Sequence, residues 1–506
     1  MFGKRAPSGE NSADEAVSDK ALQVDGAANL ESGIGNGKPE VICPPHTTEA
    51  HIKTRIDYHI LPFVCILYLL AFLDRVNVGN ARAFNLQKDL GLDPLGTQFN
   101  TVLTIFFIPY IIFEIPSNIY LKRFSPRIWL SVCCIGFGLV TMLQGFTQNY
   151  GGILATRFFL GVFECGMFPG CFYLISMWYK RDEAQKRYTL FFSSTSLAGA
   201  FGGLLASAIG KMDGIRGYSG WRWIFILEGL ITLVIGVIFL FTFPSFPEEA
   251  KWLTEDERVY VKARLEADQG RNAAERKITW RDVIHVMKDY KIWLGGFMYF
   301  GMIVPAYGYA YFSPTIIQSY HYDAIQTQLR SVPPWAASFG FAMMIAALSD
   351  WNRHRFLYAV CPIFIAIAGF AILINVHDNI NLQYAALFLV CLGTYSAMPI
   401  MVCWFSMNLG GHHRRAIGTA WQIGFGNIGG IIATYSFLAS DAVNFYRKGY
   451  IICLAFISFA AASCIVYAVA ITYENKEKEK ALKDAGMSEA EKEELGDLNP
   501  EFKYML

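Results

Sequence analysis

About twelve apolar segments, each roughly as long as the ~20 residues that a helix needs to cross a lipid bilayer, constrain this chain most. They lie near 58–79, 99–121, 128–147, 152–175, 188–210, 221–243, 291–313, 331–349, 355–375, 383–407, 416–438 and 449–472. Only 17% of the 506 residues are charged, whereas soluble proteins contain about 25%. The sequence therefore predicts an all-α integral membrane protein with twelve transmembrane helices.

A loop rich in charges of both signs separates the first six segments from the last six. We expect a disordered cytosolic N-tail at 1–56, an N-terminal six-helix bundle at 57–243, a cytosolic charged linker at 244–290, a C-terminal six-helix bundle at 291–473 and a cytosolic C-tail at 474–506. Small residues four apart recur in the fifth segment of each half, at Gly199, Gly203, Gly426 and Gly430. Such spacing lets membrane helices approach closely, and its recurrence predicts two pseudo-symmetric bundles around a central cavity.

Basic residues in the short loops predict the orientation of the spans. They follow the even-numbered spans, at Lys122, Arg123, Arg127, Lys180, Arg181, Lys186, Arg187, Arg353, Arg355, Arg414 and Arg415. Arg447 and Lys448 are exceptions on the opposite side. We expect both termini in the cytosol and the plasma membrane as the location.

Several classes of function are disfavoured by what the sequence lacks. It has no G-x-x-x-x-G-K-[ST] motif for ATP, no H-E-x-x-H motif, and no Cys/His cluster at metal-ligand spacing. A net charge of +1 gives no electrostatic reason to expect a nucleic acid partner. We expect no cofactor and no metal, and an enzyme is the class least favoured.

Ionisable side chains inside the spans are functional candidates, because each costs at least about 2.5–3.5 kcal/mol on insertion scales. They are Asp74, Arg75, Glu114, Arg157, Glu164 and Glu228, all in the first half. Glu114 precedes Ile-Pro and is expected to make a helix-end or gate contact. Glu228 lies near the start of its span and is expected at the membrane interface.

Arg157 and Glu164 are seven residues apart, which places them on one helix face about 10 Å apart. Each therefore needs a partner on another helix, and Asp74 or Arg75 is the obvious source. Burial disfavours the charged form of a carboxyl group and a nearby cation favours it, a combination that suits proton exchange. An arginine in a cavity can bind a substrate carboxylate. For Arg157 a bracing role stays open, and for Asp74 and Arg75 the alternative is a structural ion pair.

Five ordered blocks resemble the major facilitator superfamily. They are LDRVNVGNA, EIPSNIYLKRFSPRIWL, RFFLGVFECGMFPG, GWRWIFILEG and FPSFPEEAKWLTEDER. Within it the chain, over roughly 55–475, is similar to the anion:cation symporter branch and its fungal allantoate-permease group. The resemblance implies a monomeric, proton-coupled carrier of allantoate, ureidosuccinate, nicotinate, pantothenate, biotin or another small organic anion.

The resemblance also implies roles for individual residues. It implies that Arg75 binds the substrate carboxylate, that Asp74 and Glu164 take up the coupling proton, and that Arg157 partners these carboxylates. Residues implied to line the substrate pocket are Tyr110, Trp404, Gln422 and Asn427. Asp350, in the second-half loop LSDWNRHR, is expected to cap the gate.

Two rival functions remain open at this stage. The first is efflux of a secondary metabolite, which the missing Gly-Pro pair in span five disfavours. The second is a nutrient sensor without transport. The main prediction is uptake of an organic anion with protons across the bilayer by alternating access.

Overall fold

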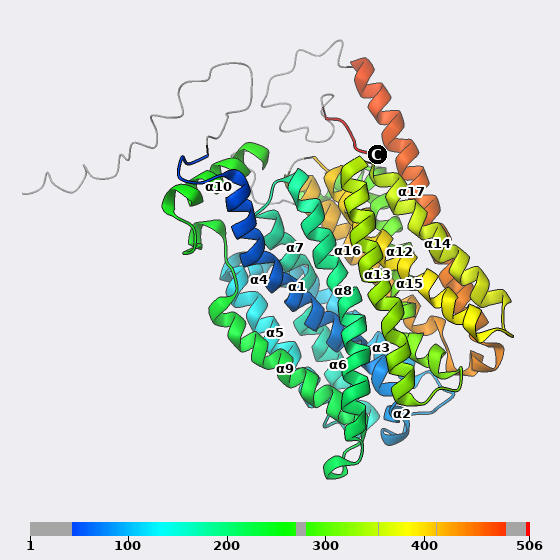
Figure 1. Ribbon diagram of the computed structural model, residues 1–506. Coiled ribbons are helices and arrows are strands. Elements are labelled where there is room, and N and C mark those ends of the chain that lie inside the picture. Colours follow the sequence, from blue (N-terminus) through cyan, green and yellow to red (C-terminus); the bar gives the residue numbers. More distant parts are fainter. Residues whose placement is uncertain (1–42, 270–279, 353, 411, 482–501) are drawn as a thin grey trace, which may run out of the picture.

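A computed structural model describes residues 43–269, 280–352, 354–410, 412–481 and 502–506. Its described part is a bundle of long helices, with residues 502–506 and α10 at the same end and α2 at the opposite end (Figure 1). We call the first end the tail end. Of the predicted tails, 1–42 and 482–501 lie outside the described residues, as do Arg353 and the side chains of Lys122, Arg123 and Arg181.

Every predicted span of the first half corresponds to helical structure. The elements are α1 (Glu49–Arg82), α2 (Leu86–Asp89), α3 (Gln98–Thr104), α4 (Phe107–Phe124), α5 (Pro126–Gln144), α6 (Tyr150–Glu164), α7 (Met167–Ser176), α8 (Arg181–Ile209), η1 (Gly210–Met212), η2 (Ile215–Gly217) and α9 (Gly220–Thr242). The second span is divided into α3 and α4, and the fourth into α6 and α7.

The linker and the second half are helical as well. Their elements are η3 (Pro247–Glu249), α10 (Glu255–Gln269), α11 (Trp280–Met287), α12 (Tyr290–Gln318), α13 (Ala324–Asn352), α14 (Arg355–Asn375), α15 (Ile380–Met407), α16 (His412–Ser436), η4 (Ala439–Asn444) and α17 (Arg447–Ala481). In the described chain, nine helices are long and apolar enough to cross a membrane. Three predicted spans are not among the nine. The second is divided into α3 and α4, and those in α12 and α16 are rich in Gly and polar or aromatic residues.

Two prolines explain the breaks in the second and fourth spans. Pro109 and Pro169 each lie four residues after the break, at Ile105 and Cys165. Because proline has no N–H, the carbonyls of Ile105 and Cys165 receive no i to i−4 bond, and the helix is interrupted there. The breaks place Phe106 and Glu164 at helix ends.

Glycines allow the two halves to meet along α8 and α13, which pack against each other. A Cβ on Gly203 would lie 2.7 Å from the Ser331 hydroxyl and 2.9 Å from the Gln328 carbonyl oxygen. A Cβ on Gly199 would collide with the ring of Trp335. The small residues therefore act at the contact between halves, as the close-approach argument requires.

Polar contacts also join the halves at the end opposite the tail end. The Asn100 side chain donates to the carbonyl oxygens of Thr434 (2.5 Å) and Phe437 (3.2 Å). The Gln328 amide donates to the Asn80 carbonyl oxygen over 3.3 Å. These bonds hold the last turn of α1 and the start of α3 against α13 and α16.

Residues 502–506 dock between helices of the second half at the tail end. The Met505 carbonyl oxygen accepts from the Trp404 indole (2.8 Å) and from the Asn408 amide (3.0 Å), and the Met505 N–H donates back to Asn408 over 2.8 Å. Tyr504 is buried and its hydroxyl accepts from Lys291 over 2.7 Å. This segment thus connects α12 and α15.

Candidate functional site

Arg75 is at the centre of a buried polar group in the membrane interior. Its Nε and Nη2 donate to the same oxygen of Glu164, over 2.9 Å and 2.6 Å. Its Nη1 donates to the Tyr307 hydroxyl. Arg75 is 4% and Glu164 0% exposed. One guanidinium thus connects α1, α6 and, from the other half, α12.

Aromatic rings surround the Arg75 guanidinium. Its carbon lies 4.8 Å from the ring centroid of Phe106, 5.0 Å from that of Tyr110 and 5.8 Å from that of Tyr307. Ring faces attract cations, more strongly where water is excluded. Tyr110, predicted to line the pocket, is brought to Arg75.

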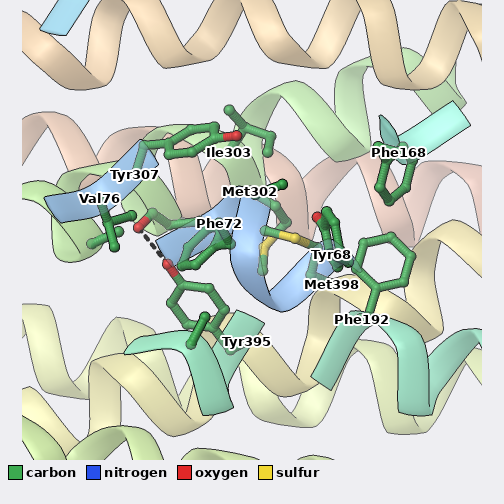
Figure 2. Close-up of a cluster of buried hydrophobic side chains, with 14 of the residues drawn as sticks. Tyr68, Phe72, Val76, Phe168, Phe192, Met302, Ile303, Tyr307, Tyr395 and Met398 are labelled. Carbon is green, nitrogen blue, oxygen red and sulfur yellow. Dashed lines mark hydrogen bonds between the residues drawn. The ribbon is translucent and has the colours of Figure 1, made fainter. Parts of the chain in front are cut away.

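An apolar cluster continues from this group between the two halves, and Figure 2 shows it. The side chains of Tyr68, Met302 and Met398 gather there, and Tyr395 donates to the Ala306 carbonyl oxygen over 2.8 Å. Tyr307 lies at one side of the same cluster. The environment of Arg75 is therefore apolar and aromatic, which strengthens its electrostatic interactions.

Asp74 does not join Arg75, although the two are adjacent in the sequence. Consecutive helical residues point about 100° apart, and Asp74 faces Thr141 on α5 and Thr232 on α9. It is 1% exposed, and neither of its oxygens accepts a hydrogen bond of ordinary geometry. The alternative of an Asp74–Arg75 ion pair does not occur in this structure.

Arg157 contacts backbone rather than a carboxylate. Its guanidinium donates to the carbonyl oxygens of Arg75 (3.3 Å) and Val102 (3.4 Å), and lies 5.3 Å from the Phe106 ring centroid. These contacts hold α6 against α1 and α3. Of the two roles left open for Arg157, substrate or proton binding and structural bracing, these contacts favour bracing in this conformation.

Glu114 lies inside α4 rather than at a helix end. It is 5% exposed, and one carboxylate oxygen has no hydrogen-bond partner. That oxygen faces α16, where a Cβ on Gly424 would lie 3.8 Å from it. Asn427, one turn further along α16, and Gln422 are both buried, and the Gln422 amide has no partner. α16 therefore carries these two buried polar side chains, and Gly424 of the same helix lies beside Glu114 at the contact between halves.

Two predicted residues are placed elsewhere. Trp404 is bonded to Met505 at the tail end and packs on Tyr467, with ring centroids 4.9 Å apart. Asp350 forms an ion pair of 2.6 Å with Arg355 in the connection between α13 and α14. Neither side chain shares a contact with the Arg75 group.

The sequence analysis did not identify Tyr307, and it placed Glu228 at the membrane interface. Tyr307 follows Pro305 in an uncharged span rich in tyrosine, and that tyrosine content was the available signal. Glu228, expected at the interface, is 1% exposed and accepts a hydrogen bond from Asn77. Its apolar neighbours on both sides in the sequence were the signal that it is buried.

The arrangement can bind an anion and a proton together. Glu164 occupies the donors of Arg75 that a carboxylate ligand would use, and its second oxygen has no partner. Protonation of Glu164 would weaken this pair and free the guanidinium, because the pair is held by opposite charges.

Comparisons with known proteins agree with the fold. The family model described as Major Facilitator Superfamily matches residues 64–434. An uncharacterised transporter of Schizosaccharomyces pombe is 31% identical over 489 residues, which cover 96% of each chain. The high-affinity nicotinic acid transporter of Saccharomyces cerevisiae is 30% identical over 466 residues, covering 91% of this chain and 86% of that protein.

Solved structures share the architecture at low sequence identity. A bacterial homologue of the human lysosomal transporter Spinster, inward-facing and unoccupied, has a TM-score of 0.62 at 13% identity and covers 84% of this chain and 98% of its own. The proton:xylose symporter XylE has a TM-score of 0.61 at 14% identity, covering 81% and 95%. The prediction of an all-α fold with two six-helix bundles is confirmed.

Proposed function

The chain belongs to the major facilitator superfamily and is a transporter of that class rather than an enzyme, and from this premise we propose that it imports a small organic anion together with protons. The observation that carries the proposal is the buried Arg75–Glu164 pair enclosed by aromatic rings. Alternating access of the two halves would move the ligand.

Arg75 would bind the carboxylate of the substrate. Its three donating nitrogens already converge on oxygen atoms of Glu164 and Tyr307, and a guanidinium matches the two oxygens of a carboxylate. The substrate would replace Glu164 at these donors.

Protons would couple to the anion through this replacement. A proton taken up by Glu164 removes the negative charge that holds Arg75, so the anion binds best when Glu164 is neutral. Asp74 would take up a proton as well, because a charged carboxylate without a partner is costly inside a membrane protein. Anion and proton would then bind together, which is symport.

The walls of the site favour a flat, aromatic anion. Phe106, Tyr110 and Tyr307 lie within 5.8 Å of the guanidinium, and aromatic rings pack well on other rings. A relative at 30% identity is named a high-affinity nicotinic acid transporter. We therefore place nicotinate and similar heteroaromatic carboxylates first, before allantoate, ureidosuccinate and the other members of the allantoate-permease range.

The remaining assignments complete the proposal. The chain would act as a monomer in the plasma membrane, with the tail end in the cytosol, two bundles at 57–243 and 291–473, and the linker 244–290 on the cytosolic side. Support for the linker's place comes from α10, whose Glu257 pairs with Arg55 of α1 over 3.0 Å at the tail end.

The test is uptake of labelled carboxylates, nicotinate first, into proteoliposomes with and without an inward proton gradient. We expect gradient-driven accumulation by the wild type and its loss in Arg75→Ala. The matched control is Arg82→Ala on the same helix, because Arg82 is half-buried and contacts Gln87 and Phe99 instead of Glu164.

Normal accumulation by Arg75→Ala would contradict the proposal. So would the absence of uptake for the whole panel together with export of the same compounds from loaded vesicles, which would indicate efflux. Because Arg75→Ala leaves Glu164 buried without its cation, Arg75→Ala/Glu164→Gln is measured in parallel to separate loss of binding from misfolding.

A further inference from the structure

A second buried polar cluster lies inside the first half, between α1, α5 and α9. Its members are Asp74, Asn77, Thr141, Glu228 and Thr232, each no more than 1% exposed. The Asn77 amide donates to one oxygen of Glu228 and accepts from Asn80 over 3.2 Å. The cluster is therefore built on three helices that also pack on each other.

Most oxygen atoms of this cluster lack a hydrogen-bond partner. Within the described residues, both oxygens of Asp74, the second oxygen of Glu228, and the hydroxyls of Thr141 and Thr232 are buried without a hydrogen bond of ordinary geometry, although both threonines face Asp74. Buried polar groups in proteins are nearly always paired. The two threonine hydroxyls can donate to Asp74, but the second Glu228 oxygen has no donor among the described residues, and none of these groups supplies a positive charge. A hydrogen atom or a cation is therefore needed to balance the two carboxyl groups.

The charges that face the cluster do not neutralise it. The acidic and thiol groups on the neighbouring elements are Cys134 on α5, Glu164 on α6 and Cys171 on α7, and α12 contributes Tyr307. The Arg75 guanidinium is bonded to Glu164 and Tyr307, and Arg157 to carbonyl oxygens. On α8 all charged residues lie in the first two turns, where Arg187 is paired with Asp57.

We propose that Asp74 and Glu228 form a proton-binding carboxyl pair, separate from the Arg75–Glu164 pair. The two carboxylates would bring two negative charges into the membrane interior without a cation, and one added proton forms an O–H bond on one carboxyl and removes one of the two charges. A proton fits better than a metal ion, because the described residues contain no group of three or more acidic, His or Cys side chains that could hold one.

A lateral cavity gives this pair an opening on the bundle flank. The cavity has a volume of about 220 Å³ and is lined by Glu228 and by apolar side chains of α1, α8 and α9, namely Leu69, Leu70, Leu73, Phe201, Leu205 and Ile231. Glu228 lines this cavity but is itself only 1% exposed, so a small apolar reagent reaches its carboxyl from the lipid side when the lining side chains shift. The role of the pair in transport rests on the proposed function, but proton binding by the pair does not.

The test is infrared spectroscopy of the purified full-length protein in lipid vesicles, titrated with pH in the absence of substrate and of any gradient. We expect a carboxylic acid band in the wild type that is missing from Asp74→Asn/Glu228→Gln. In the wild type the pair loses its protons in two steps as pH rises. In each single variant the remaining carboxyl should lose its proton, and with it the acid band, about one pH unit or more below the second wild-type step, because the like-charged neighbour is gone.

Acid bands identical in the double variant and the wild type, or single variants that titrate as the wild type does, would overturn the proposal, whereas bands of Glu114 and Glu164 are expected to remain in every variant. Loss of the band on adding sodium would assign the pair to a metal cation and overturn it as well. The infrared experiment does not measure transport. A failure of the carboxylate uptake test would therefore leave its results unchanged, and the two proposals can fail separately.

A second measurement uses the wild-type protein, so it tests the proposal even if a variant fails to fold. A hydrophobic carbodiimide adds the O–H of a protonated carboxyl across its N=C=N unit, and mass spectrometry locates the product. We expect labelling at Glu228 that falls as pH rises. Labelling that is confined to other carboxyl groups, or that does not change with pH, would contradict a protonated pair at the cavity.

Discussion

The Arg75 guanidinium donates two hydrogen bonds to one oxygen of Glu164, over 2.9 Å and 2.6 Å, and the other oxygen has no partner among the described residues. The pair is fully enclosed, so its two charges interact with little screening by water. An anion that takes the Nε and Nη2 donors must displace Glu164 from them.

The first prediction concerns Glu164→Gln. The variant keeps the shape of the side chain but cannot ionise. We therefore expect exchange of labelled for unlabelled anion across the membrane to persist. Gradient-driven accumulation, the ratio of internal to external anion concentration, should fall to about one. Rates in this variant should depend less steeply on external pH than those of the wild type, because Asp74 is still present. Counterflow and accumulation measured in the same vesicles check this, and a retained proton-driven accumulation would show that coupling does not need Glu164.

The second prediction concerns Tyr307→Phe, which removes the only hydroxyl that Arg75 contacts across the halves within the described residues. Hydrogen bonds to charged groups contribute about 1.5–3 kcal/mol, so KM for the anion should change about tenfold or more. Tyr299→Phe is the matched control on the same helix, because the Tyr299 hydroxyl makes no hydrogen bond with the described residues. Equal KM values for the two variants would argue against a role for Tyr307 in the site.

The third prediction concerns the glycine contact between the halves. Gly203→Leu would force α8 away from Ser331 and Gln328, so we expect a loss of about 1–3 kcal/mol, seen as a lower melting temperature, and slow transport. Gly340→Leu on α13 is the control, since a Cβ there meets no atom within 4 Å. If both variants melt alike, close approach at Gly203 is not what holds the halves together.

The fourth prediction separates Trp404 from the substrate site. Trp404→Phe removes the indole N–H that donates to Met505, which should speed hydrogen exchange at the Met505 amide about tenfold while KM stays within about twofold. Trp421→Phe is the control, because the buried Trp421 indole N–H has no partner to lose. A large KM change in Trp404→Phe but not in Trp421→Phe would instead support the prediction that Trp404 lines the substrate pocket.

The sequence by itself determined the class of protein, the positions of the spans and the residues that the membrane makes costly. These depend on hydrophobic length and on single side chains, which are local properties. The proline breaks at Ile105 and Cys165 are local as well, because they follow from a missing N–H four residues ahead.

The tertiary structure alone decided which charges meet. Asp74 and Arg75 are neighbours in the sequence, yet Arg75 is bonded to Glu164 and Tyr307 while Asp74 faces Thr141 and Thr232. These partners depend on how each helix is rotated against its neighbours, and that rotation is set by packing of whole helices, glycine contacts included. For the same reason Glu228 is buried beside Asn77 rather than at the interface.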